Sequence, residues 1–326
     1  MLLGLPASGK SEIRRYLAGL GAEVMHRDLH LGPTVELDDY PYVHLMRRIS
    51  QELRRLGHDP VFFGSDELPM SDPRDWGTLV NLLNEDYADL HRPVAIAGSA
   101  AEWLFDRYDG ARIRARVEPG LGELPTELRA ALADPLEAEA QQLRRRKQDL
   151  AAGGIEGRTI LIEFSRGGPD GAPMPLPEPH GYRYSLGQLS EGILSRASIL
   201  YMLVTPAESR RRNRERALPG PEGDASILHH GVPEPVMSAD YGTDDLRWLL
   251  DQSEVRDTVT VPAHGRVFRL PVGVIDNRRD KTSFLRDDPA DWPPEAVRTA
   301  HRALREALDK LVTVRSSLPD AAGPTG

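Results

Sequence analysis

The 326-residue chain contains no cysteine, which excludes disulfide bonds, thiolate metal sites and cysteine nucleophiles. Aromatic residues make up only 6% of the sequence. No apolar run approaches the roughly 18 residues of a membrane-spanning helix, and no basic segment followed by an apolar stretch opens the chain as in a secretory signal. We therefore expect a cytoplasmic protein that does not enter a membrane.

The chain is also short of positive charge. It has 50 acidic residues against 41 Lys and Arg, so its formal net charge is −9. Broad binding to nucleic acid or to anionic membranes favours basic surfaces, and this balance argues against both. The length suits one large domain with an insertion, or two domains.

One short motif stands out at the start of the chain. Residues 4–11 read Gly-Leu-Pro-Ala-Ser-Gly-Lys-Ser, the G-x-x-x-x-G-K-S pattern of a phosphate-binding loop (P-loop). An apolar run precedes the motif and an amphipathic helical pattern follows it, which is the strand–loop–helix context that the motif requires. In such a loop, backbone N–H groups and the helix N-terminus cradle polyphosphate oxygens. The predicted nucleotide-binding residues are Gly4, Pro6, Ala7, Ser8, Gly9, Lys10 and Ser11.

Two side chains of the motif carry specific roles. Lys10 is expected to reach the β- and γ-phosphates, and the Ser11 hydroxyl to bind Mg²⁺. The apolar run before Gly4 has only three residues, whereas a strand usually has about five or six. Either the native chain starts upstream of Met1, or this first strand is unusually short.

The rest of the chain alternates between strand and helix patterns. Strands are predicted at 24–26, 61–63, 159–164, 197–204 and 267–275, and helices at 42–56 and 294–312. The pattern indicates an α/β fold, a three-layer P-loop NTPase with a mostly parallel sheet and a helical insertion. We divide it into a first half of the core (1–70), a helical insertion on the cap or substrate side (71–157), a second half of the core (158–285) containing a lid (206–243), and a C-terminal helix with a disordered tail (286–326).

Two acidic sites are candidates for catalysis. Asp38 lies 28 residues after Lys10, a separation that allows a helix and a return strand that ends in this acid. Asp38 is our candidate for the general base that accepts a proton from an attacking hydroxyl, with Asp28 as a rival. Asp39 is expected to cap the next helix, to lie beside the metal or to contact substrate. Glu163 ends the 159–164 strand and is predicted to order Mg²⁺ or its waters, although it could instead cap a turn. Arg166 is predicted to grip the substrate.

Five arginines crowd the helix predicted after Pro206, at positions 210, 211, 212, 214 and 216. A solvated basic helix is one interpretation. The alternative is a lid whose arginines stabilise charge on a transferred phosphoryl group, and we expect Arg212 and Arg214 to be catalytic in this way.

These segments together resemble the P-loop kinases of small molecules and nucleosides, the uridine kinase and nucleoside/nucleotide kinase group. The resemblance includes residues 4–11, the Asp38-Asp39-Tyr40-Pro41 segment (similar to D-x-F-Y), Glu163 with Arg166, and residues 201–206 with the arginine helix behind them. It implies that Asp38 is the base and that the helix 210–216 contributes lid arginines. The 71–157 block and the proline-rich segment 167–181 differ from that group. The resemblance therefore does not indicate which acceptor this protein phosphorylates.

We therefore expect an enzyme, an ATP- and Mg²⁺-dependent phosphotransferase acting on a small-molecule hydroxyl or phosphate acceptor, nucleosides and nucleotides included. Another NTP could replace ATP. The alternatives are an NTP-hydrolysing regulatory ATPase or switch with a protein partner, and a polynucleotide end kinase, which the net charge disfavours.

Overall fold

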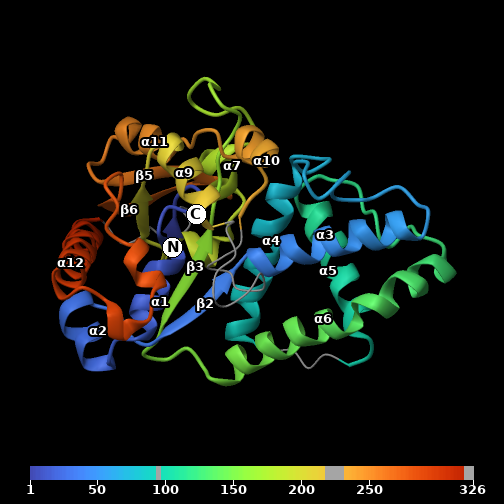
Figure 1. Ribbon diagram of the computed structural model, residues 1–326, viewed down its shortest axis with the longest axis horizontal. Coiled ribbons are helices and arrows are strands. Elements are labelled where there is room, and N and C mark those ends of the chain that lie inside the picture. The colour runs from blue at the N-terminus through green and yellow to red at the C-terminus, as the bar shows by residue number, and fades with distance from the viewer. Residues whose placement is uncertain (93–96, 217–230, 319–326) are drawn as a thin grey trace.

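The computed structural model describes residues 1–92, 97–216 and 231–318 and is organised around one sheet (Figure 1). Within these residues the sheet has six strands in the order β2-β3-β1-β4-β6-β5. They are β1 (Leu2–Leu3), β2 (Thr34–Asp38), β3 (Thr159–Phe164), β4 (Ile199–Leu203), β5 (Thr258–Ala263) and β6 (Arg266–Asp276). All neighbouring strands are parallel except β5 and β6, which form an antiparallel pair. The prediction of an α/β fold with a mostly parallel sheet is confirmed.

Helices make up most of the remaining described chain. They are α1 (Lys10–Ala18), α2 (Ala22–Leu29), α3 (Tyr40–Arg55), α4 (Asp75–His91), α5 (Ala100–Arg114), α6 (Thr126–Ala152), α7 (Gly181–Gly187), α8 (Glu191–Leu194), α9 (Pro206–Arg216), α10 (Glu234–Asp240), α11 (Leu246–Gln252) and α12 (Pro294–Ser317), with short 3₁₀ segments η1 (Ser283–Arg286) and η2 (Pro289–Asp291).

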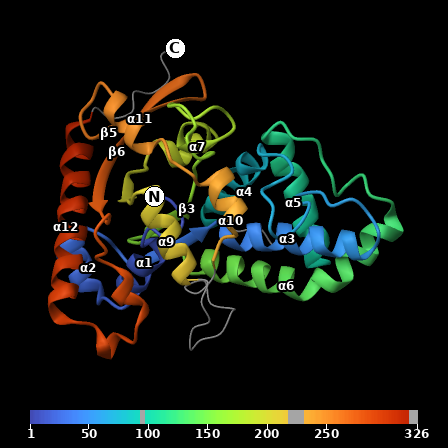
Figure 2. The same cartoon turned by 45° about the horizontal axis from the view of Figure 1, so that its top comes forward.

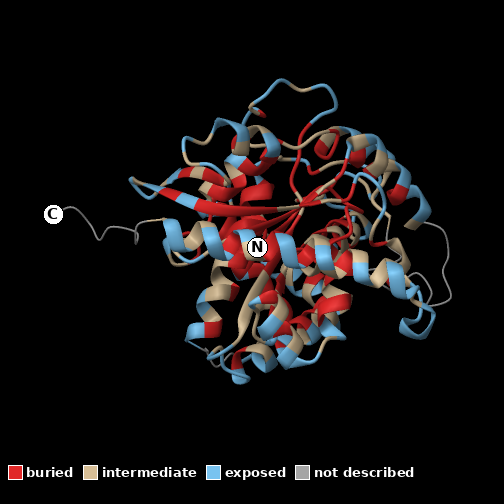
Figure 3. Cartoon of the chain, turned by 90° about the vertical axis from the view of Figure 1, so that its left-hand side faces the viewer, coloured by how far each residue is buried: buried red, intermediate tan, exposed pale blue. Residues whose placement is uncertain are grey.

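The two faces of the sheet have separate apolar cores, because successive side chains of a strand point to opposite faces. Leu2 packs with residues of α1 and α12, such as Leu17 and Leu304. Leu3 packs on the other face with residues of α7 and α11, such as Leu186 and Leu246. Figure 3 shows the buried strands between helices that are exposed on their outer sides. The two-residue strand β1 is therefore held from both faces despite its length.

A third core lies inside a block of helices, α3 to α6, beside the β2 side of the sheet (Figure 2). The predicted 71–157 segment is helical, as expected, and supplies α4, α5 and α6. Helix α3, from the first part of the chain, packs on α6 and shares the same core through residues such as Met46 and Ile49. Because α3 starts directly after β2, it connects the sheet to this block.

Two local predictions are wrong, and one strand was missed. Residues 24–26 lie in α2, where Met25 and Leu29, four positions apart, are both buried against α12. Three apolar residues in a row fit either a strand or one side of a helix, and only the partner decides. Residues 61–63 contribute a single bridge, Phe63 to Met70, in place of a strand. Strand β5, which pairs with β6, was not predicted at all.

The predicted lid is only partly described. Residues 206–216 form α9, and α10 lies within 231–243. The intervening residues 217–230, and the predicted disordered tail from 319 onward, lie outside the described residues. Across the ranges that are described, no helix is both long and apolar enough to cross a membrane.

Candidate functional site

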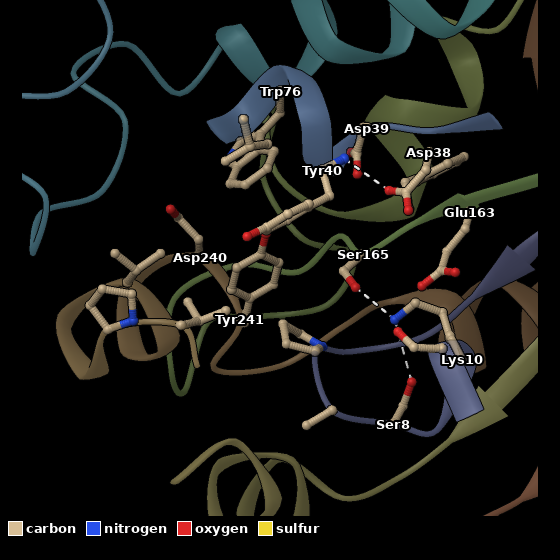
Figure 4. A pocket seen from close by; sticks show the side chains of 18 of the residues that line it. Ser8, Lys10, Asp38, Asp39, Tyr40, Trp76, Glu163, Ser165, Asp240 and Tyr241 are labelled. Atoms are coloured by element: carbon tan, nitrogen blue, oxygen red, sulfur yellow. Dashed lines mark hydrogen bonds between the residues drawn. The ribbon is translucent and has the colours of Figure 1, made fainter. Parts of the chain in front are cut away.

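A cleft opens where β1, β2 and β3 end, which is the edge at which open α/β sheets bind ligands. Its empty space, open solvent included, is about 990 Å³. Segments distant in sequence meet there: the residue 4–11 loop, the start of α3, the end of β3 and helix α10. In Figure 4, Ser8, Lys10, Ser165 and Glu163 lie on one side, and Trp76, Tyr241 and Asp240 on the other.

The loop between β1 and α1 has the backbone that the motif predicts. Gly9 immediately precedes α1 with φ +104°, and a Cβ on it would lie 2.5 Å from Thr282 Oγ1. Gly4 has φ +151°, and a Cβ there would lie 2.7 Å from the Met202 carbonyl oxygen. Only glycine fits these two positions without displacing neighbours. Pro6, Ala7, Ser8 and Ser11 line the cleft.

Lys10 is buried with its side chain folded back along this loop. Its Nζ donates to the Gly4 and Leu5 carbonyl oxygens, each at 3.0 Å, and to Ser165 Oγ at 2.7 Å. Burial lowers the pKa of the ammonium, while nearby Glu163 and Asp39 oppose that shift. Lys10 therefore lies where it can meet an anion held by the loop. Ser165 was missed by the sequence analysis, although a polar residue just after a strand that ends at the site is a recognisable signal.

Three further residues support the loop from outside the cleft. The Tyr182 hydroxyl accepts from the Gly4 N–H at 2.7 Å. Ser209 Oγ, on α9, donates to the Pro6 carbonyl at 2.7 Å, and Asn277 Nδ2 donates to the Ser8 carbonyl at 2.8 Å. These side chains come from 178 to 269 positions away along the chain, so no local pattern could have identified them.

Two of the predicted acidic residues are neighbours across the sheet. Asp38 and Glu163 are register partners on β2 and β3. Arg14, on α1, lies between them and donates through Nη1 to Asp38 Oδ2 at 2.7 Å and to Glu163 Oε2 at 2.8 Å. It also pairs with Glu36. Burial and the neighbouring Asp38 raise the pKa of Glu163 to about 6, although Arg14 and Lys10 oppose the rise. Arg14 was not predicted as a site residue.

The helix cap expected from Asp39 at the start of α3 is made by Asp38. Asp39 occupies the N-cap position, but its side chain makes no capping hydrogen bond, so the predicted cap is wrong. Asp38 Oδ1 accepts the Tyr40 N–H at 2.8 Å instead. Both oxygens of Asp38 are thus engaged by donors. Asp39 is buried in the cleft wall, and burial raises the pKa of its carboxyl.

Arg166 does not reach into the cleft, contrary to its predicted contact with substrate. Its guanidinium is 2% exposed and donates to Asp39 Oδ2 at 2.7 Å. It also stacks between the rings of Trp76 and Phe164, at 4.9 Å from each ring centroid. Arg166 therefore positions Asp39, because its ion pair and both stacking contacts keep it behind the wall.

The arginines of α9 divide into different environments. Arg212, predicted to be catalytic, is buried outside the cleft and donates to Glu208 and to the Asn277 carbonyl, each at 2.7 Å. Arg214 is exposed and lies 3.6 Å from Glu234. Arg216 is the α9 arginine that lines the cleft. We therefore assign Arg212 a supporting role beneath the loop, since Asn277 holds the Ser8 carbonyl.

The rival base Asp28 is remote from the cleft. It lies on α2, where it pairs with Arg27 at 2.8 Å and approaches His301 of α12 at 3.6 Å. It is not among the residues that line the cleft. An acceptor bound in the cleft would not meet Asp28.

Few side chains in the cleft could bind Mg²⁺. Ser11 and Glu163 both line the cleft, but the described residues contain no group of three or more His, Asp or Glu that could hold a metal ion. Mg²⁺ often binds through one or two side chains together with substrate phosphates and water. The residues present fit a Mg²⁺ that arrives with a triphosphate, and not a metal held by protein groups alone.

Replacing Arg14 with methionine should destabilise the protein by about 3 kcal/mol at pH 8, because it leaves three partly buried carboxylates without their cation. Because the pKa of Glu163 is raised to about 6, its carboxyl becomes charged, at a cost in stability, as pH rises through that value. The loss of stability caused by Arg14→Met should therefore be smaller at pH 5 than at pH 8. Chemical denaturation at both pH values measures this effect. Arg27→Met, at a site 60% exposed and paired with Asp28, is the control and should unfold as the wild type does. Equal losses at pH 5 and pH 8 would contradict the prediction.

Comparisons with protein-family models, with curated proteins and with solved structures found no match to this chain.

Proposed function

We propose that this protein is a P-loop kinase, which transfers the γ-phosphoryl group of ATP, bound with Mg²⁺, to a small-molecule acceptor. The observation that carries the proposal is the placement of the residue 4–11 loop. It joins a central parallel strand to the N-terminus of α1, with two glycines in the left-handed region and Lys10 folded along it. A loop of this kind presents backbone N–H groups and a helix dipole to polyphosphate.

The proposal assigns a role in phosphoryl transfer to the residues on each side of the cleft. Lys10 and the loop N–H groups hold the β- and γ-phosphates, and Ser11 and Glu163 are the side chains available to Mg²⁺, which would neutralise phosphate charge. Asp39 accepts the proton of the acceptor hydroxyl. We favour Asp39 over Asp38 because Arg14 and the Tyr40 N–H already engage both Asp38 oxygens, and because burial raises the pKa of Asp39.

The half of the cleft away from Lys10 favours a kinase with a small acceptor over a regulatory ATPase or a polynucleotide end kinase. Its wall is aromatic and apolar, with contributions from α3, α4 and α10. An apolar wall of this kind suits a compact organic molecule. A regulatory ATPase needs no such wall beside its nucleotide, and a polynucleotide end kinase would have to attract a polyanion to a chain with a net charge of −9.

The experiment that tests the proposal has two stages. Calorimetry with a non-hydrolysable ATP analogue and Mg²⁺ should detect binding to the full chain. Incubation with ATP and a metabolite panel, followed by mass analysis, should then reveal a product heavier by one phosphoryl group. Absence of analogue binding would overturn the P-loop assignment. Binding with acceptor-independent hydrolysis, and no phosphorylated product, would favour the regulatory ATPase instead.

A further inference from the structure

The acceptor half of the cleft has aromatic side chains on more than one side. Trp76, at the start of α4, and Tyr241, after α10, are packed edge to face with ring centroids 5.6 Å apart. Tyr40 and Phe63 line the same half. Figure 4 shows the Trp76, Tyr40 and Tyr241 side chains together on the side of the cleft away from Lys10. Flat rings bind well against such surfaces, since aromatic pairs gain energy beyond simple burial.

Asp240 provides an unusual polar group in this apolar wall. It lines the cleft, its residue is 4% exposed, and its Oδ2 has no hydrogen-bond partner among the described residues. A buried carboxylate oxygen without a partner is costly, so its presence in a native structure calls for an explanation. Burial raises the pKa of Asp240 to about 6, while Arg47 and the Trp76 side chain oppose the rise. A donor group on a bound molecule would satisfy this oxygen.

The charges of this half do not suit a phosphate ester. Asp38, Asp39 and Asp240 all line the cleft, and a second phosphate would add negative charge beside them. Arg47 and Arg216 both line the cleft, and Arg216 acts electrostatically on Lys10 as well as on Tyr40. The Arg47 guanidinium lies 4.0 Å from the Phe63 ring centroid and donates to the Asp66 carbonyl at 2.7 Å. Phosphate recognition favours paired guanidinium donors facing the ligand.

We infer that the acceptor is an uncharged alcohol built on a flat ring that carries a second hydrogen-bond donor, with the ring against Trp76 and Tyr241 and the donor on Asp240. This inference rests on the proposed kinase function and excludes the phosphate acceptors that the sequence left open. The hydroxyl oxygen of the acceptor forms a bond to the γ-phosphorus while the bond from that phosphorus to the β,γ-bridging oxygen breaks. ADP leaves with the electron pair, and Asp39 takes the hydroxyl proton.

The test compares three probes. They are 4-hydroxybenzyl alcohol, 4-methoxybenzyl alcohol, which lacks the second donor, and phenyl phosphate. Ligand-observed NMR at millimolar concentration, with Mg²⁺ and a non-hydrolysable ATP analogue present, measures their affinities for the full chain. We expect 4-hydroxybenzyl alcohol to bind best, and loss of the donor to weaken binding by about tenfold. In Asp240→Leu, which removes both acceptor oxygens, the two alcohols should bind within about twofold of each other. Asp66→Asn, a control that does not line the cleft, should keep the preference.

The outcomes separate this inference from the kinase proposal, because analogue binding is measured in the same samples. If the analogue does not bind, the kinase proposal fails. If the analogue binds but phenyl phosphate is preferred, both alcohols bind equally to the wild type, or no probe binds, the acceptor inference alone is overturned.

A second measurement needs no acceptor. Ionised Asp240 lies beside Arg47 of α3, Trp76 of α4 and its neighbour Tyr241, and its raised pKa means that its charge costs stability as pH rises toward about 6. Asp240→Asn should therefore melt a few degrees above the wild type at pH 8, with a smaller difference at pH 4. A lower melting temperature at pH 8 would make Asp240 a structural group and overturn its assignment to the acceptor.

Discussion

Lys10→Ala should abolish measurable phosphoryl transfer and weaken triphosphate binding by about 100-fold or more, while the protein stays folded. Lys10 is the buried cation at the loop, and its Nζ lies among the loop carbonyls and Ser165. A charge-assisted contact to the β- and γ-phosphates acts in both the bound and the transition state, so both binding and rate should fall. Calorimetry with the ATP analogue measures the first loss, and product mass analysis measures the second.

The fold should survive this change, because removing the ammonium also removes the cost of burying it, which is visible in its lowered pKa. Circular dichroism and thermal melting check this. Lys310→Ala is the matched control, since Lys310 lies on α12 and pairs with Asp257 at 2.7 Å, away from the cleft. A folded Lys10→Ala protein with unchanged ATP affinity and turnover would refute the phosphate-binding role of the loop.

Asp39→Asn should lower the transfer rate by about 10³-fold with little change in ATP affinity, because a general base acts only as the acceptor hydroxyl loses its proton. Asparagine keeps the shape of the side chain and still accepts from Arg166, which holds Asp39 Oδ2 at 2.7 Å. The rate of the wild type should fall as pH drops through the pKa of the base, and burial places that pKa above the ordinary aspartate value. Rate measurements across pH with saturating ATP test both statements.

Asp38→Asn is the comparison that makes this prediction specific. Asp38 holds Arg14 and caps the Tyr40 N–H, so its loss should mainly destabilise the protein and reduce the transfer rate much less. An inactive Asp38→Asn protein with normal stability, beside an active Asp39→Asn protein, would return the base to Asp38, as the sequence pattern favoured. If Asp38→Asn and Asp39→Asn were both active, neither carboxylate would be the general base.

The helical block α3 to α6 contributes to the apolar half of the cleft through α3 and α4. Helix α3 starts at the cleft edge of the sheet directly after Asp39 and continues into the core of the block. Trp76 of α4 connects this block to the cleft, where its ring contacts Tyr241 and the Arg166 guanidinium. Substitutions in the block therefore have a direct physical route to Asp39, through Trp76 and Arg166.

Local sequence was sufficient wherever a function depends on neighbouring residues. The Gly4–Ser11 loop was predicted from its motif, and the strand of Glu163 from its run of apolar residues. The strand that ends at Asp38 was predicted from its separation from Lys10. All three depend on residues close together in the sequence. The prediction of a mostly parallel sheet followed from the same alternation of strands and helices.

The tertiary structure decided which side chains these elements bring together. Arg14 and Glu163 meet across 149 positions, Arg166 and Asp39 across 127, and Tyr182 and Gly4 across 178. The burial and charge of such distant partners determine whether Arg166 points to substrate or to a carboxylate. They also determine whether Asp38 or Asp39 is engaged by hydrogen-bond donors. The sequence by itself determined the Gly4–Ser11 loop and the strands around it, because those depend on local backbone geometry. The roles of the acids and arginines depend on long-range electrostatics, which exist only once the chain has folded.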